Sequence, residues 1–179
     1  MKKYIRASEI SEKLFGLKLP KPSHKDELTR IDRMNMGTFY EKQIIDYISS
    51  KLNMKTYYKI NKKNIEKYAF SIGENDYYII GRADGLIYAS YTDGVNIYRY
   101  EYVLEVKNMI SYSIKDFNET IPDYYIYQVQ AYSYLYNLPV LFVAQCYDGY
   151  IFDKISKEDD KIKQLISNIR DKIIERYAS

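Results

Sequence analysis

Residues 76–108 read DYYIIGRADGLIYASYTDGVNIYRYEYVLEVKN, and apolar or aromatic residues alternate with polar ones over much of this length. An alternation of period two is typical of β-strands, because successive side chains point to opposite faces of a sheet. The pattern predicts strands over 76–88 and 97–108, and Asp93-Gly94 between them is the turn signal of a hairpin. We therefore expect the two strands to lie side by side in an antiparallel pair.

Three charged residues of this hairpin come close together when it folds. Glu105 and Lys107 are two residues apart and share one face of the second strand, while Asp84 lies on the first strand. Two neighbouring carboxylates repel each other unless one is protonated or a cation lies between them. Their oxygens suit a hard divalent ion such as Mg²⁺ or Mn²⁺, and a lysine beside them can contact a phosphate. The alternative interpretation is a surface cluster of ion pairs on a solvated strand face.

The flanking sequence predicts further strands and the helices that cover them. In chain order these are a short helix over 8–15, a helix over 26–52, strands over 56–60 and 66–73, a helix over 122–137, strands over 139–146 and 150–155, and a helix over 156–179. Residues 139–146, PVLFVAQC, are almost all apolar, as expected of a strand buried on both faces. The element order predicts an α/β fold in which a central mixed β-sheet is flanked by helices on both faces.

Composition indicates one globular domain over residues 1–179, divided into a basic helical N-terminal part over 1–55, a sheet core over 56–155 and the C-terminal helix. Hydrophobic residues make up 46% and charged residues 28%, which excludes a disordered chain. Because no apolar run could span a bilayer and the N-terminus lacks a signal-peptide core, we expect an intracellular, cytoplasmic protein without membrane contact. The single cysteine, Cys146, excludes an internal disulfide and a cysteine-ligated zinc or iron–sulfur site.

Positive charge is concentrated in the first part of the chain. Residues 1–67 carry 16 lysines and arginines against 8 acidic residues, whereas residues 68–179 carry 11 against 16. This asymmetry suits a polyanion bound beside a carboxylate-lined site, and it also occurs in proteins whose basic faces are merely solvated. If the polyanion is nucleic acid, Lys59, Lys62 and Lys63 are candidate phosphate contacts.

Two further pairs of residues have the spacing of neighbours on one helical face. Glu41 follows Gly37 by four residues, and Tyr132 follows Gln128 by four. Gly37 would allow its helix to approach the sheet or a phosphate closely. Taken alone, Glu41 is explained as well by an ordinary surface position, and the second pair by the abundance of tyrosine in its helix.

In this order, the four motifs resemble those of the PD-(D/E)XK nuclease superfamily. They are G-x-x-x-E at 37–41, G-R-x-D at 81–84, E-V-K at 105–107 and Q-x-x-x-Y at 128–132. The similarity extends over about residues 29–145 and is greatest to the RecB-type branch, which includes lambda-exonuclease-like enzymes and the nuclease that trims CRISPR spacer precursors. It implies a single-domain restriction-endonuclease-like fold.

The resemblance also implies a role for each motif residue. Asp84 and Glu105 would be ligands of Mg²⁺ or Mn²⁺, with the backbone carbonyl of Val106 as a further ligand. Glu41 would lie at the edge of the metal site, directly or through water. Lys107 would contact the scissile phosphate and help to orient or deprotonate the attacking water.

The remaining motif residues would act around this centre. Gln128 and Tyr132 would position the active-site strand or the nucleic-acid backbone, and Arg82 would contact nucleic acid. The chain departs from many RecB-type members, which have a histidine where it has Glu41, because its only histidine is His24 in a proline-rich loop. It also lacks the four cysteines of the iron–sulfur branches, which favours a lambda-exonuclease-like or minimal viral or archaeal variant without the cluster.

The function implied is a Mg²⁺- or Mn²⁺-dependent deoxyribonuclease that acts on single-stranded DNA or on duplex ends by in-line attack of water. A non-cleaving nucleic-acid-binding protein of the same fold is one alternative. A Holliday-junction resolvase shares the fold but lacks Q-x-x-x-Y, and a small protein acting through protein partners is a further alternative. DNA is the expected partner, and a homo-oligomer or recombination, repair or CRISPR-type partner proteins remain open.

Overall fold

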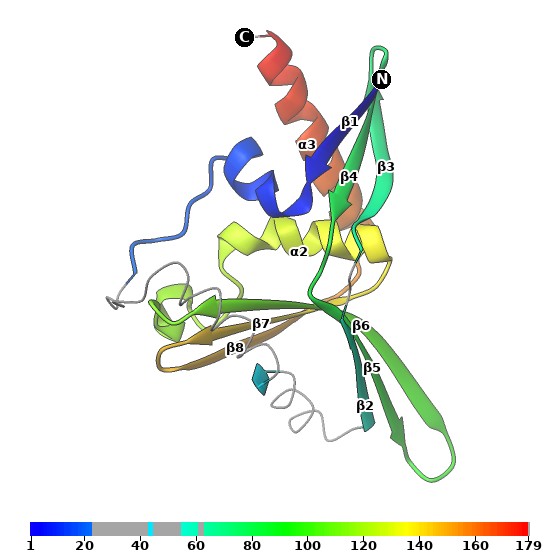
Figure 1. The fold of residues 1–179 in the computed structure, drawn as a ribbon, viewed down its shortest axis with the longest axis vertical. Coiled ribbons are helices and arrows are strands. Elements are labelled where there is room, and N and C mark those ends of the chain that lie inside the picture. Colours follow the sequence, from blue (N-terminus) through cyan, green and yellow to red (C-terminus); the bar gives the residue numbers. More distant parts are fainter. Residues whose placement is uncertain (23–42, 45–54, 61–62, 179) are drawn as a thin grey trace.

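The computed structural model describes residues 1–22, 43–44, 55–60 and 63–178. Within them, α2 lies between two β-sheets (Figure 1). The elements are β1 (Lys2–Arg6), η1 (Ala7–Glu9), η2 (Ile10–Leu14), β2 (Lys55–Ile60), β3 (Ile65–Ile72), β4 (Asn75–Gly81), β5 (Gly85–Thr92), β6 (Ile97–Met109), η3 (Ile114–Phe117), α2 (Asp123–Tyr136), β7 (Val140–Cys146), β8 (Gly149–Ile155) and α3 (Asp159–Ala178). No described helix combines the length and the apolar character needed to cross a membrane.

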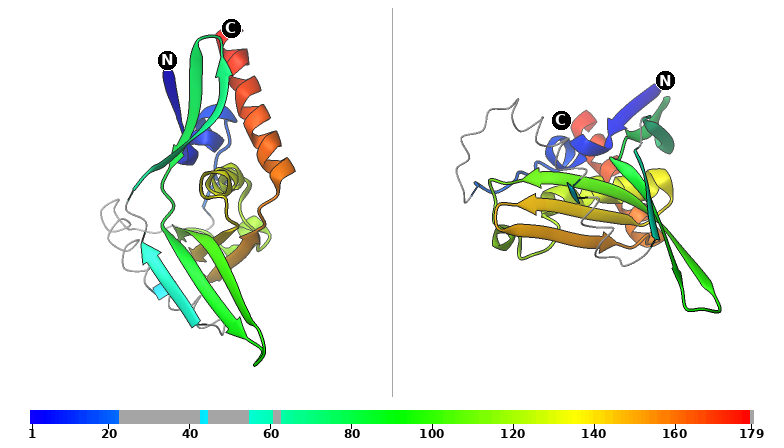
Figure 2. Two further views of the ribbon diagram at one scale, coloured as in Figure 1. Left: turned by 90° about the vertical axis from the view of Figure 1, so that its right-hand side faces the viewer. Right: turned by 60° about the horizontal axis from the view of Figure 1, so that its bottom comes forward.

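The two sheets are both mixed. The three-stranded sheet has the order β1-β4-β3, and the five-stranded sheet has the order β2-β5-β6-β7-β8. The pairs β1–β4 and β6–β7 are parallel, and the other pairs are antiparallel. Figure 2 shows α3 running alongside β3 and β4, with α2 seen end-on above the five-stranded sheet. The predicted mixed α/β architecture is confirmed, although the strands are divided between two sheets instead of one.

The prediction of one strand over 76–88 is wrong in one respect, because this segment forms two strands that belong to different sheets. β4 ends at Gly81, and β5 begins at Gly85. A Cβ atom on Gly81 would come within 2.9 Å of the Tyr132 ring, so glycine allows the end of β4 to pack directly on α2. Period-two burial continues through the break, and for this reason the sequence pattern does not reveal it.

The N-terminal part predicted to be helical over 1–55 begins instead with the strand β1. The short 3₁₀ and π turns η1 and η2 follow, in place of the continuous helix predicted over 8–15. Of the helix predicted over 26–52, only Gln43 and Ile44 belong to the described residues, and both are helical. The rest of that helix lies outside the part of the chain that the structure describes.

Hydrophobic side chains are buried on both faces of the five-stranded sheet. The α2 side is lined by Val103, Phe142 and Ala144, and α3 joins the same core through Leu165. The opposite face forms a second cluster, whose buried members are Ile44, Ile87, Leu104, Leu141 and Val143. The prediction of a β7 strand buried on both faces is therefore confirmed.

The predicted helices and strands of the C-terminal half are confirmed, with small differences at their ends. Pro122 precedes the first residue of α2, where its fixed φ suits the start of a helix. Asn137, in the left-handed conformation, ends α2. The last helix begins at Asp159 rather than at 156, and its buried residues are Leu165, Ile169 and Ile173.

Candidate active site

Asp84 lies where the chain passes from one sheet to the other. Its Oδ2 accepts a hydrogen bond from the backbone N–H of Val106 at 2.7 Å. The pairing of β5 with β6 ends at Gly85 and Leu104, so the carboxylate provides an acceptor just beyond the end of the ladder. The fold thus brings Asp84 to the E-V-K segment, as the hairpin predicts.

Glu105 is buried rather than solvated. Its side chain is 2% exposed, and its Oε1 pairs with Lys107 Nζ and accepts a hydrogen bond from Gln128 Nε2 at 2.8 Å. Its Oε2 is also buried and has no hydrogen-bond partner among the described residues. A buried acceptor gains from any donor or cation that it contacts, so this oxygen is suited to bind a further ligand. The burial excludes the interpretation of Glu105 as part of a solvated surface cluster.

The environment changes the proton affinity of both charged groups. Burial is the main cause that raises the pKa of Glu105 to about 7, and the nearby Asp84 carboxylate raises it further while Lys107 opposes the rise. Burial alone would lower the pKa of Lys107, but its charge and hydrogen bond with Glu105 outweigh burial and raise that pKa. Lys107 therefore keeps its positive charge at neutral pH, and Glu105 binds a proton more tightly than an exposed glutamate does.

The predicted pair on α2 meets this cluster. Gln128 Nε2 lies 3.0 Å from Tyr132 Oη in addition to its contact with Glu105, and both α2 side chains are buried. Tyr132 Oη in turn donates a hydrogen bond to the backbone carbonyl of Arg82 at 3.1 Å. The helix is thereby connected to both chain segments that carry a carboxylate of the site.

Sequence reasoning missed two tyrosines of the same helix. Tyr136 Oη accepts a hydrogen bond from the backbone N–H of Ala83 at 3.3 Å. The Tyr125 ring lies with its centroid 5.2 Å from Lys107 Nζ, and burial is the main cause that raises the pKa of its hydroxyl to about 12. The signal for Tyr136 was its position four residues after Tyr132, on the same helical face.

The residues that are predicted to contact nucleic acid, and whose side chains the structure describes, lie at the surface. Arg82 is exposed, directly before the buried Ala83, and Lys63 is exposed ahead of β3. Lys59 belongs to β2, but its side chain lies outside the described residues, as does Lys62. Glu41, Gly37 and His24 also lie outside them.

The donor atoms suit a hard divalent cation. The Asp84 carboxylate and Glu105 Oε2, which accepts no hydrogen bond from the part of the chain that the structure describes, are oxygen donors near the backbone of Val106. No group of three or more histidine, cysteine, aspartate or glutamate residues gathers as a metal site within the described ranges. Two carboxylates suffice for Mg²⁺, which commonly keeps several water ligands, so the residues fit such an ion.

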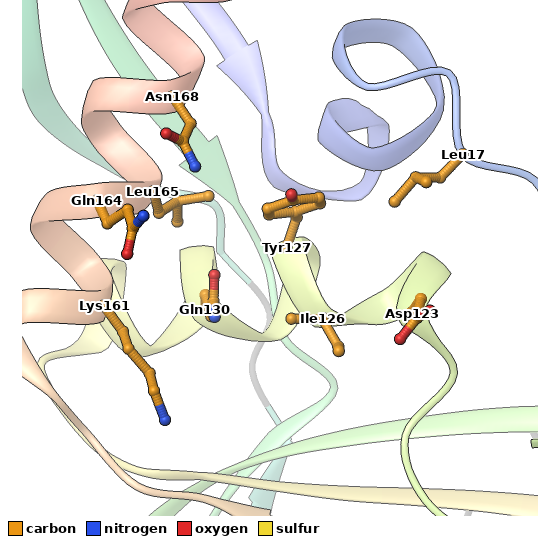
Figure 3. A pocket seen from close by; sticks show the side chains of 9 residues that line it. All are labelled: Leu17, Asp123, Ile126, Tyr127, Gln130, Lys161, Gln164, Leu165 and Asn168. Carbon is orange, nitrogen blue, oxygen red and sulfur yellow. The ribbon is translucent and has the colours of Figure 1, made fainter. Parts of the chain in front are cut away.

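A cavity of about 410 Å³ lies beside α2 (Figure 3), and neither Asp84 nor Glu105 is among its lining residues. It is bordered by α2, α3 and the segment after η2. Its lining residues are Leu17, Asp123, Ile126, Tyr127, Gln130, Lys161, Gln164, Leu165 and Asn168. Gln128 and Tyr132 are not among them, so α2 presents one face to the carboxylates and another to this cavity.

No family model matches the sequence, and no curated protein sequence matches it. Among solved structures, the alkaline exonuclease LHK-Exo from Laribacter hongkongensis is similar, with a TM-score of 0.56 and 14% identity over 98% of this chain and 88% of that chain. The chain has a restriction-endonuclease-like fold. The structure of SSO0001 aligns with a TM-score of 0.47 and 17% identity over 75% of this chain, which spans only 57% of that longer chain.

Proposed function

We propose that this chain is a divalent-metal-dependent nuclease that hydrolyses phosphodiester bonds in DNA, with residues 1–179 forming one nuclease domain. The observation that carries the proposal is the buried Glu105 Oε2, which accepts no hydrogen bond from the described residues and lies beside Asp84 and Lys107. This combination offers two anionic oxygen donors to a cation and one ammonium group to a phosphate. The fold shared with an alkaline exonuclease is consistent with this chemistry and supports the lambda-exonuclease-like assignment.

Each side chain of the cluster has a defined task in this proposal. Asp84, Glu105 and the Val106 carbonyl hold Mg²⁺ or Mn²⁺, which offsets phosphate charge and activates a water when bound. Lys107 donates hydrogen bonds to the scissile phosphate and stabilises the negative charge that develops there. Gln128 restrains the Glu105 carboxylate through Oε1, so that Oε2 remains available to the ion.

The substrate proposed is single-stranded DNA or the end of a duplex. Arg82 is exposed two residues before Asp84, and it would contact the phosphate backbone close to the reacting bond. Lys63, together with Lys59 and Lys62, would extend the basic surface for the same strand. Glu41 would lie at the edge of the metal site.

The test is digestion of end-labelled duplex, single-stranded DNA and supercoiled plasmid with Mg²⁺, with Mn²⁺ or with EDTA. The wild type should release nucleotides with either metal and none with EDTA. Asp84→Asn and Glu105→Gln should each abolish cleavage, whereas the matched control Glu101→Gln, exposed on the same strand and face as Glu105, should retain it. Cleavage that survives in the Asp84→Asn, Glu105→Gln double variant would refute the proposed site.

A further inference from the structure

A single peptide unit, the one between Arg82 and Ala83, is held at both of its polar groups by α2. Its carbonyl accepts a hydrogen bond from Tyr132 Oη at 3.1 Å, and its N–H donates to Tyr136 Oη at 3.3 Å. A peptide unit is planar, so contacts at the oxygen and at the hydrogen together determine its orientation. The two tyrosines therefore act as a clamp on this one unit.

The chain has few other ways to satisfy this peptide unit. It lies between β4, whose pairing ends at Gly81, and β5, whose pairing begins at Gly85, so residues 82–84 belong to neither strand ladder. Ala83 is 0% exposed, so water does not reach its N–H in place of the tyrosine oxygen. Removal of the Tyr136 hydroxyl would leave a buried donor unsatisfied, which favours a rotation of the peptide unit.

The next residue in the chain is Asp84, so the clamp acts close to the proposed metal site. Gln128, Tyr132 and Tyr136 follow one another at intervals of four residues along one stripe of α2. Gln128 holds Glu105, and the two tyrosines hold the peptide unit before Asp84. A single helical stripe thus connects the two carboxylates, although they belong to different strands.

We propose that Tyr136 is a positioning residue, which together with Tyr132 sets the place of Asp84 relative to Glu105. This inference rests on the proposed function, because it assigns Tyr136 a role at the same metal site. Partners that orient metal ligands typically alter metal affinity by about 10- to 100-fold when they are removed. Tyr136 acts through the backbone, one residue away from Asp84, and we expect a loss of about 10-fold, the lower limit of that range.

The test compares two variants of the same helix, each of which removes one hydroxyl group. Tyr136→Phe removes the acceptor for Ala83, and the control Tyr134→Phe removes a hydroxyl that donates to the carbonyl of Tyr68 in β3. Mn²⁺ binding is measured by calorimetry without DNA, and cleavage is measured as a function of Mn²⁺ concentration. Thermal unfolding of both variants reports the effect of each hydroxyl on the stability of the fold.

We expect Tyr136→Phe to weaken Mn²⁺ binding about 10-fold and to raise the Mn²⁺ concentration for half-maximal cleavage by the same factor. Its rate at saturating Mn²⁺ should stay within about twofold of wild type, because the ligands themselves are intact. Tyr134→Phe should retain the wild-type metal affinity.

Three results would overturn the inference, and they are distinguishable. If the wild type binds Mn²⁺ and cleaves, but Tyr136→Phe has wild-type metal affinity, the positioning role is wrong and the proposed function stands. If Tyr136→Phe loses activity that saturating Mn²⁺ does not restore, the tyrosine has a different role. If the wild type neither binds Mn²⁺ nor cleaves DNA, the proposed function fails and this inference fails with it.

Discussion

β6 has an outer half over 97–102 and an inner half over 103–109, and charged residues alternate with other residues in both. The environments of the two halves are nevertheless opposite. Arg99 and Glu101 in the outer half are exposed, whereas Glu105 in the inner half is buried and Lys107 is half-buried, although all four lie on the same face. The outer half pairs only with β5 at the projecting end of the hairpin, as Figures 1 and 2 show. The inner half pairs with β7 and contacts α2.

This difference shows that an alternating charged pattern does not by itself indicate a functional site. Exposed ion pairs typically contribute about 0–1 kcal/mol, because water and salt screen them. A buried carboxylate depends on its neighbours, and removal of one partner of a buried pair costs about 3–5 kcal/mol. Substitutions of Glu105 and Lys107, the charged residues of the inner half, should therefore have large effects.

The largest expected effect is the loss of DNA cleavage when the ammonium group of Lys107, in the inner half of β6, is removed. Lys107→Met should reduce the cleavage rate at least ~100-fold, because in the proposed mechanism the scissile phosphate would lose its ammonium partner. Mn²⁺ binding, measured by calorimetry, should persist, since both carboxylates remain. Arg99→Met in the outer half is the control and should cleave at the wild-type rate. Equal losses in the two variants would remove the distinction between the halves.

The second effect is a pH dependence of stability caused by Glu105. Its pKa is about 7 in the folded chain and 4.5 in the reference state, so the folded state binds the proton more tightly. The metal-free protein should therefore be most stable below pH 4.5 with respect to this group, and lose up to ~3 kcal/mol as the pH rises to about 7. Mn²⁺ binding should strengthen over the same interval, because the ion displaces the proton.

Urea unfolding between pH 4.5 and pH 7.5 measures this contribution. Glu105→Gln should remove it, because an amide does not titrate, whereas the exposed Glu101→Gln should retain it. A pH profile that is the same in Glu105→Gln and in wild type would assign the dependence to other groups.

The third effect tests whether α2 causes the special environment of the inner half. Gln128→Ala removes the donor to Glu105 Oε1, and we expect turnover to fall about 10-fold, with a smaller loss of metal affinity. Single-turnover cleavage at saturating Mn²⁺ is the measurement. Gln130→Ala, on the cavity side of the same helix, should be unaffected. A wild-type rate for Gln128→Ala would make its contact with Glu105 irrelevant to catalysis.

The smallest effect concerns exposed charge outside β6. Lys63→Ala should lower the slope of log affinity against log salt concentration by about 1, because one phosphate contact releases about one counterion. Binding of single-stranded DNA in Ca²⁺ at several salt concentrations measures that slope. Lys163→Ala on α3 is the control for a lysine far along the chain from the basic N-terminal part. An unchanged slope in Lys63→Ala would remove this lysine from the DNA-binding surface.

Local sequence determined the strands of the hairpin, the helix α2 and the buried strand β7. Period-two alternation, the Asp93-Gly94 turn and helical spacing are properties of neighbouring residues, so they are visible without the fold. The spacing of the E-V-K and Q-x-x-x-Y motifs was sufficient to place Glu105 and Lys107, and also Gln128 and Tyr132, on shared faces.

Only the tertiary structure decided that the strand over 76–88 is interrupted and that Glu105 is buried. It also decided which of the chain's 23 tyrosines, Tyr136, accepts the hydrogen bond from the Ala83 N–H. Each of these features depends on α2, which lies about 40 residues beyond Asp84 in the sequence. Hydroxyl groups from that helix take the place of strand pairing at the crossing, and its Gln128 covers the inner half of β6. Contacts between segments so far apart are set by packing, and no local pattern contains them.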